Sequence, residues 1–145
     1  MEIHSSQDIL LQQENGIVQV TMNRPKALNA LSYEMIDRFT ALLPEWERNP
    51  DLKAVIIKGS GDRAFCAGGD IKSAYQVGKN YKEGVFTLSD AAAFFRDEYR
   101  LNRALYHTKV PLVALMNGIV MGGGFGIAGP CKYRLCSENT VFAMP

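Results

Sequence analysis

The residues best suited to chemistry lie in a glycine-rich stretch toward the end of the chain. Three consecutive glycines at 122–124 follow an apolar run at 112–116 and an Asn117-Gly118 pair. Adjacent glycines forgo side-chain packing and lose more chain entropy on ordering than alanine does, so a triplet beside a buried strand indicates that something approaches bare backbone there. If the glycines open a helix, their unpaired N–H groups point toward a group that is or becomes negative.

A second glycine pair, Gly68-Gly69, precedes Asp70 and follows the segment 64–67. Two glycines followed by an aspartate are typical of a turn that leads into a helix, so this loop also offers N–H groups beside a strand end. The simpler interpretation is a structural turn. If the two loops converge, they suit acyl chemistry, because a thioester oxygen gains negative charge when the carbonyl is attacked or enolised. One such donor contributes about 3 kcal/mol.

Glu98 is the carboxylate whose position is most unusual. In the helix expected at 90–107, Phe94, Leu101 and Leu105 form one apolar stripe, and Glu98 occupies the place between them. An unpaired charge facing inward is heavily penalised, and its pKa is raised. Either Glu98 faces a functional site, or a partner such as Arg103 makes it purely structural.

Other catalytic and nucleotide-binding motifs fit poorly. A literal G-x-G-x-x-G occurs at Gly124, Gly126 and Gly129, but Gly129-Pro130 stops the helix after about two turns, whereas a dinucleotide fingerprint needs a long helix. A phosphate-binding P-loop fails because no Lys-Ser or Lys-Thr follows the glycines. Cys66 is better explained as a small packed residue than as a nucleophile.

Composition narrows the class of protein. The 145 residues fit one domain, and 16 Lys and Arg against 15 Asp and Glu give a net charge of +1, so nothing favours nucleic acid as a partner. Three cysteines without C-x-x-C spacing argue against disulfides and a zinc site and are typical of a reducing compartment. No run is long enough to span a membrane and no signal peptide is evident. We expect a soluble intracellular protein, without a metal, that binds a small molecule.

The elements that position these residues form an α/β pattern. Asn15-Gly16 between two β-prone runs predicts a hairpin, and Ser32 is expected to cap a helix that kinks or ends at Pro44. The cations Arg24 and Lys26, in the loop at 23–29, are either solvated or phosphate ligands. The other expected elements are strands at 54–57, 112–116, 131–136 and 140–144, a mobile connection or lid at 76–88, and a helix at 90–107 capped by Ser89.

Three of these segments resemble successive signatures of one family. Residues 23–31 (NRPKALNAL), 64–71 (AFCAGGDI) and 117–124 (NGIVMGGG) resemble the crotonase (enoyl-CoA hydratase/isomerase) superfamily, and they occur in the family's order over nearly the whole chain. The resemblance implies a crotonase-like ββα spiral of stacked sheets with flanking helices. It also implies an acyl-coenzyme A substrate, no separate cofactor, and a homo-oligomer of the superfamily's trimer type.

The resemblance also assigns roles to single residues. It implies that the N–H groups of Gly69 and Gly123 form an oxyanion hole. The residues that it implies for binding the coenzyme A moiety are Lys26, Ala27, Leu28, Ala67, Gly69, Asp70 and Ile71.

The branch within the superfamily follows from Gly126. Hydratases carry a catalytic Glu at the position of Gly126, so the hydratase pattern is broken. Residues 94–99, 121–124 and 142–145 are instead similar to the 3-hydroxyisobutyryl-CoA hydrolases, thioesterases of valine breakdown. In that branch the position of Glu98 contacts substrate. The expected reaction is hydrolysis of a small 3-hydroxyacyl-CoA, in the cytoplasm or the mitochondrial matrix.

The apolar run at 140–145 ends the chain without a cap or polar tail, so we expect residues 1–145 to be the N-terminal portion of one domain that is incomplete at its C-terminus. The family has a Glu immediately after Met144-Pro145 and an Asp further on, which supply the nucleophile or base. The 145 residues alone are therefore expected to have little thioesterase activity. The alternatives are an enoyl-CoA hydratase or isomerase with a displaced acid, and a non-catalytic acyl-CoA-binding fragment.

Overall fold

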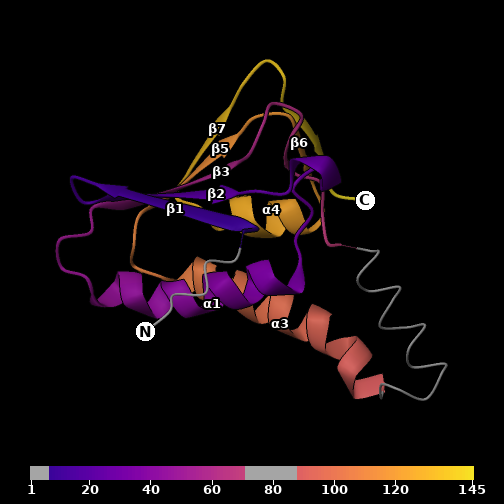
Figure 1. The fold of residues 1–145 in the computed structure, drawn as a ribbon, viewed down its shortest axis with the longest axis horizontal. Helices are drawn as coiled ribbons and strands as arrows, with labels where there is room; N and C mark the ends of the chain where they lie inside the picture. Colours follow the sequence, from indigo (N-terminus) through magenta and orange to yellow (C-terminus); the bar gives the residue numbers. More distant parts are fainter. Residues whose placement is uncertain (1–6, 71–87) are drawn as a thin grey trace.

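A computed structural model describes residues 7–70 and 88–145, with side chains placed from residue 92 onward in the second range (Figure 1). Three expectations fall outside these residues. They concern Ile71, the helix expected after Asp70, and the lid expected at 76–88, of which only residue 88 is described. The strands are β1 (Ile9–Glu14), β2 (Ile17–Met22), β3 (Ala54–Gly59), β4 (Ala64–Cys66), β5 (Leu112–Met116), β6 (Ile119–Met121), β7 (Tyr133–Cys136) and β8 (Val141–Ala143). The helices are the 3-10 helix η1 (Pro25–Ala27) and the α-helices α1 (Tyr33–Arg48), α3 (Leu88–His107) and α4 (Gly123–Ala128).

The hairpin at the start of the chain is confirmed. β1 and β2 pair antiparallel, and the two residues between them, Asn15 and Gly16, have φ angles of 52° and 81°. Positive φ at both central positions is the conformation that matches the twist of the flanking strands, and Asn-Gly adopts it readily.

Two sheets are built from a repeated pattern of two strands and a helix. β2, β3, β5 and β7 are parallel and, with β1 at one edge, form a five-stranded sheet in the order β1-β2-β3-β5-β7. The strand that follows each of β3, β5 and β7 joins a second parallel sheet in the order β4-β6-β8. The repetition of this step confirms the predicted spiral arrangement. β6 was not predicted, because three apolar residues directly before a glycine triplet resemble a loop.

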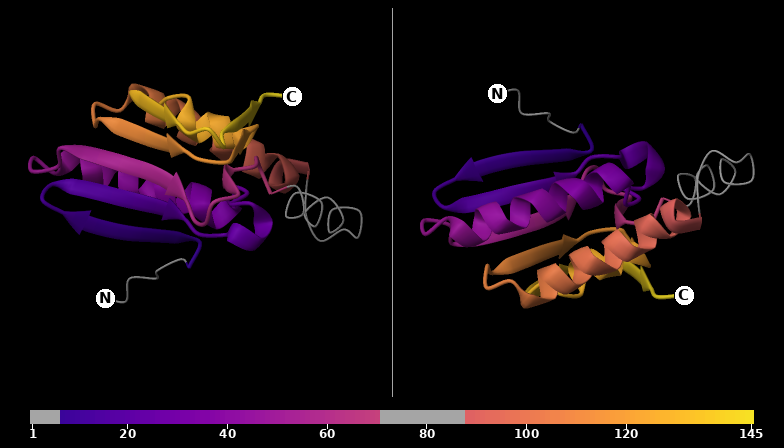
Figure 2. Two further views of the ribbon diagram at one scale, coloured as in Figure 1. Left: turned by 90° about the horizontal axis from the view of Figure 1, so that it is seen from above. Right: turned by 90° about the horizontal axis from the view of Figure 1, so that it is seen from below.

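The helices α1 and α3 cover one face of the five-stranded sheet. They run side by side in contact, α1 beneath the β1–β3 half and α3 beneath β5 and β7 (Figures 1 and 2). Among the described residues, no helix is long and apolar enough to cross a membrane.

The cap and the apolar face of α1 are confirmed. The Met35 amide donates to Ser32 Oγ at 3.2 Å. The expected apolar stripe is buried, namely Met35, Ile36, Phe39, Leu42, Leu43 and Trp46. Of the two alternatives expected at Pro44, a kink or an end, the end is wrong, since α1 continues to Arg48. Leu43 and Trp46, on either side of the proline, are both buried, and that burial offsets the hydrogen bond that proline removes.

α3 begins at Leu88, so Ser89 lies inside the helix and the predicted cap is wrong. The apolar stripe is confirmed, because Phe94, Leu101 and Leu105 are all buried. Glu98, within that stripe, is buried with them. The helix therefore carries a carboxylate into the interior, as its spacing predicted.

Candidate functional site

Gly69 presents an amide to the interior because of how its neighbours pair. The Leu31 amide donates to Gly68 O at 2.8 Å, and the Asp70 amide donates to Leu31 O at 3.0 Å, which makes a single parallel bridge between Leu31 and Gly69. In such a bridge the flanking residues bond to the partner and the central residue turns its own N–H to the other side. No described residue accepts a hydrogen bond from the Gly69 amide.

Gly123 presents its amide because it opens a helix. It is the first residue of α4, and the amides of Phe125 and Gly126 both donate to Gly122 O, at 2.9 and 3.2 Å. The first amides of a helix have no intrahelical acceptor. No described residue accepts a hydrogen bond from the Gly123 amide. Because α4 has only six residues, its contribution is the N–H group itself rather than a helix dipole.

The two glycines and Glu98 meet at one point. A Cβ added at Gly123 would lie 3.2 Å from Gly69 N and would clash with Glu98 Oε1. A Cβ added at Gly68 would lie 4.0 Å from Gly123 N. A side chain at position 123 would displace the Glu98 carboxylate and crowd the Gly69 amide, so glycine lets the two loops approach this closely.

A cavity of about 360 Å³ opens at this point. It lies between α3 on one side and the two glycine loops on the other. Its lining residues are Ala67, Gly68, Gly69, Asp70, Phe94, Phe95, Glu98, Tyr99, Asn102, Met121, Gly122, Gly123, Gly126, Met144 and Pro145. Two N–H donors and one carboxylate in a largely apolar cavity can bind a carbonyl oxygen and a hydroxyl or water.

Glu98 has no charged partner among the described residues. Its exposed fraction is 7%, and no hydrogen bond or ion pair joins it to another described residue. Burial raises the pKa of its carboxyl group. The alternative in which Arg103 neutralises it is wrong, because Arg103 is exposed and forms no ion pair with Glu98. The Glu98 carboxyl group therefore lies beside the backbone of Gly123, and no ion pair with a described residue explains why a carboxylate is buried there.

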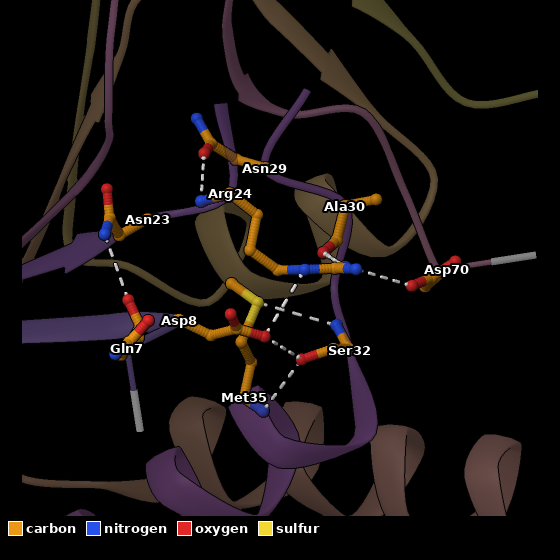
Figure 3. A network of polar contacts seen from close by, with 9 residues as sticks. All are labelled: Gln7, Asp8, Asn23, Arg24, Asn29, Ala30, Ser32, Met35 and Asp70. Atoms are coloured by element: carbon orange, nitrogen blue, oxygen red, sulfur yellow. Dashed lines mark hydrogen bonds and ion pairs between the residues drawn. The ribbon is translucent and has the colours of Figure 1, made fainter. Parts of the chain in front are cut away.

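Arg24 ties the loop before α1 to the Gly69 segment (Figure 3). Its guanidinium lies 2.9 Å from Asp70 Oδ2 and 3.3 Å from Asp8 Oδ2, and it donates to Ala30 O at 2.7 Å. The Arg24 amide donates to Asn29 Oδ1 at 2.9 Å. These contacts position the loop and Asp70 together, so in this structure the Arg24 side chain serves the architecture of the site.

Lys26, Ala27 and Leu28, expected to bind coenzyme A, lie beside the cavity rather than in it. Lys26 and Ala27 are exposed and line a separate hollow of about 400 Å³. Leu28 links the two places, since its carbonyl accepts from the Ala67 amide at 3.1 Å. The structure thus brings Ala67, Gly69 and Asp70 to the cavity and leaves the tip of the loop outside it.

Asn29 is a supporting residue that the sequence analysis did not single out. It is fully buried, with φ 53°, and its Nδ2 donates to Ser60 O at 2.9 Å and to Ala64 O at 2.8 Å. Asn tolerates the left-handed region better than most residues, which was the available signal. Leu28 shares this conformation with φ 53°, so the loop is locally strained next to the site.

Cys66 is a packing residue, as predicted. It is fully buried, and burial raises the pKa of its thiol to about 11. A Cβ added at Gly124 would lie 3.0 Å from Cys66 Cβ, so the first turn of α4 packs directly on this strand. All three cysteines, Cys66, Cys131 and Cys136, are free thiols, as expected.

Asn102 is a second residue that the sequence analysis missed. It lines the cavity one helical turn after Glu98, and its Oδ1 is buried without a hydrogen-bond partner among the described residues. The spacing of four from Glu98 was the signal that could have identified it.

Comparison with known proteins identifies the family of the chain. A family model described as enoyl-CoA hydratase/isomerase matches residues 17–145. Similar curated relatives include the 3-hydroxyisobutyryl-CoA hydrolase, mitochondrial, of Gallus gallus, 45% identical over 97% of this chain and 35% of the relative. The protein of the same name from Homo sapiens is 41% identical over 97% of this chain and 35% of the relative. The chain thus spans about a third of the length of these relatives.

Solved structures agree in fold. A carnitinyl-CoA dehydratase from Mycobacterium thermoresistibile matches with a TM-score of 0.87 and 37% identity, over 97% of this chain and 39% of that chain. An enoyl-CoA hydratase from Rhodobacter sphaeroides matches with a TM-score of 0.84 and 34% identity, over 94% of this chain and 39% of that chain. These matches confirm the predicted crotonase-like fold. Because the family model covers most of its residues, the chain belongs to the enoyl-CoA hydratase/isomerase family.

Proposed function

We propose that this chain forms the oxyanion-binding side of an acyl-CoA thioesterase site and that the protein hydrolyses 3-hydroxyisobutyryl-CoA. The observation that carries the proposal is the convergence of the unpaired amides of Gly69 and Gly123 beside buried Glu98. The curated relatives with 41% to 50% identity are named 3-hydroxyisobutyryl-CoA hydrolases, which supports this substrate over other acyl-CoA esters.

In the proposed reaction the thioester oxygen sits between the two amides. Water attacks the carbonyl carbon, the oxygen becomes negative, and the tetrahedral intermediate collapses by breaking the C–S bond. The coenzyme A sulfur then takes up a proton, and a carboxylic acid remains. The two amides stabilise the negative oxygen, and removing one such donor costs about 3 kcal/mol.

Glu98 orients the substrate hydroxyl or a water in this proposal. Its carboxyl group faces the cavity beside Gly123 and has no ion-pair partner among the described residues, so its acceptor capacity is available to a ligand. The residue that activates the attacking water is, by the family resemblance, the Glu that follows the Met-Pro pair matching Met144-Pro145.

The coenzyme A moiety is proposed to run from the cavity toward the loop at Lys26, Ala27 and Leu28. The hydrogen bond between Leu28 O and the Ala67 amide supports this path, because it joins the loop to the cavity wall. Ala67, Gly69 and Asp70 border the start of the path. Ile71, also proposed as a contact, lies outside the described residues.

A homo-oligomer and an intracellular location, cytoplasm or mitochondrial matrix, complete the proposal. The chicken and human relatives are named mitochondrial, which supports the second compartment.

A second candidate is an enoyl-CoA hydratase or isomerase, favoured by the similarity to solved hydratase and dehydratase structures. The test supplies 3-hydroxyisobutyryl-CoA and crotonyl-CoA separately to the protein expressed from its complete reading frame. Release of free coenzyme A thiol from the first substrate, with the enoyl absorbance of the second unchanged, is expected. Loss of enoyl absorbance without thiol release contradicts hydrolysis. Binding of both without turnover supports a non-catalytic acyl-CoA-binding protein.

A further inference from the structure

Asn102 carries a polar group that no other described residue uses. Its Oδ1 is buried without a hydrogen-bond partner among the described residues, whereas its Nδ2 is not fully buried and donates no hydrogen bond to a described residue. A buried polar atom without a partner is costly, and an apolar side chain of similar size would avoid the cost. Packing alone therefore does not account for an asparagine at this position.

The carboxamide of Asn102 lies close to Gly126. A Cβ added at Gly126 would lie 2.7 Å from Asn102 Nδ2 and 2.9 Å from Oδ1, so the amide group packs directly on the backbone of α4. Leu101, its neighbour on α3, is buried in the core and anchors the same turn. Because Oδ1 is buried and Nδ2 is not, the N–H donor of the carboxamide is the group that a ligand in the cavity can reach.

Glu98 and Asn102 line the same cavity. Residues four apart on a helix lie on the same face, and both side chains line the cavity at Gly123. A carboxylate accepts hydrogen bonds only, whereas a carboxamide also donates. A single hydroxyl group can satisfy both, because its hydrogen points to one side chain while its oxygen accepts from the other.

We propose that Asn102 is a specificity-determining residue that, together with Glu98, recognises the hydroxyl group of a 3-hydroxyacyl chain. The hydroxyl donates to the Glu98 carboxylate and accepts from the Asn102 carboxamide. This inference rests on the proposed function and specifies its substrate class. A thioester without the hydroxyl leaves the Asn102 amide unused and gains nothing from the pair.

The test compares 3-hydroxyisobutyryl-CoA with isobutyryl-CoA, which differs only by the hydroxyl. The complete protein, Asn102→Leu, Asn102→Ser and Arg103→Ala are assayed for kcat/KM on both, and their Tm values are measured. Leucine keeps the volume and removes the polar atoms, serine restores a donor, and Arg103 is the exposed neighbour on the same helix.

Asn102→Leu is expected to lower kcat/KM for the hydroxylated substrate about 10- to 100-fold and to leave isobutyryl-CoA unchanged, because only the hydroxyl loses a partner. Its Tm is expected to stay the same or rise. Asn102→Ser should recover part of the preference for the hydroxylated substrate. Arg103→Ala should leave kcat/KM unchanged for both substrates.

Equal losses on both substrates, a fall in Tm that accounts for the loss, or unchanged selectivity overturns the inference. Hydrolysis of neither thioester by the unaltered protein refutes the proposed function separately. Binding of the two thioesters, measured by calorimetry, then decides the inference. If the unaltered protein binds 3-hydroxyisobutyryl-CoA more tightly than isobutyryl-CoA and Asn102→Leu does not, the inference is supported. If the unaltered protein binds both thioesters equally, the inference is refuted.

Discussion

The Gly69 amide nitrogen lies 3.2 Å from the point where a side chain of Gly123 would begin. These residues are far apart in the chain, and they meet because β4 and β6 are neighbouring parallel strands that end at the same edge of the small sheet. The register of that pair therefore sets the distance between the two proposed donors.

Gly123→Ala is expected to lower kcat about 10²- to 10³-fold, the range for loss of an oxyanion donor. The added methyl group would clash with Glu98 and crowd the Gly69 amide. In Gly69→Ala the methyl group would meet the Phe94 ring at 3.4 Å, an ordinary contact, so a smaller loss is expected. Steady-state kinetics of both variants check this. A greater loss in Gly69→Ala than in Gly123→Ala would contradict the geometry.

Glu98→Gln is expected to lower activity about 10²-fold and to stabilise the protein at neutral pH. The unfolded chain ionises Glu98 near pH 4.3, and burial raises the pKa of the folded form. Below pH 4 both states are protonated and the charge costs nothing. The penalty grows as pH rises from the unfolded pKa to the folded pKa and is constant above it, so the Tm advantage of Glu98→Gln should begin between these two values and be complete above the folded one.

Thermal unfolding of the Glu98→Gln protein and its parent between pH 3 and pH 8 measures this. A variant less stable than its parent at pH 7 would show that the folded protein stabilises the Glu98 charge.

Cys66→Ala is expected to retain kcat within a few-fold, because burial keeps the thiol protonated, with its pKa raised to about 11. Loss of the sulfur should cost about 1 kcal/mol of stability through packing against α4. Steady-state kinetics measure the effect on kcat, and denaturant unfolding measures the effect on stability. Abolished turnover in a stably folded variant would make Cys66 a nucleophile.

Arg24→Gln is expected to destabilise the protein by about 1 to 3 kcal/mol, because it removes the ion pair to Asp70 and the bond to Ala30. The KM for acyl-CoA should rise as the loop loosens. Arg48→Gln, at an exposed position of α1, is the matched control and should change stability by less than about 0.5 kcal/mol. If Arg24 instead binds phosphate directly, the KM will rise with stability unchanged.

Local signals in the sequence were enough for much of the fold. Asn15-Gly16 set the hairpin, Ser32 set the start of α1, and the interrupted apolar stripe around Glu98 identified a buried carboxylate. Each depends on residues within about one or two helical turns or a single hairpin, where patterning is direct.

The features that the sequence analysis missed depend on contacts between segments that are far apart in the chain. Strand β6 forms because β4 and β8 lie on either side of it, and its three residues carry little pattern of their own. The spacing of Asn102 from Glu98 was visible in the sequence, but its unpartnered Oδ1 and the closeness of its amide to Gly126 depend on the tertiary structure. α1 continues past Pro44 because residues around it are buried in the core.

The most direct test of the central claim is a crystal structure of the complete protein with a non-hydrolysable 3-hydroxyacyl-CoA analogue that keeps the carbonyl group. The carbonyl oxygen is predicted to lie about 2.7–3.1 Å from both the Gly69 and the Gly123 amide nitrogens. An oxygen bonded to neither amide, or to only one with the other turned out of the cavity, would contradict the account.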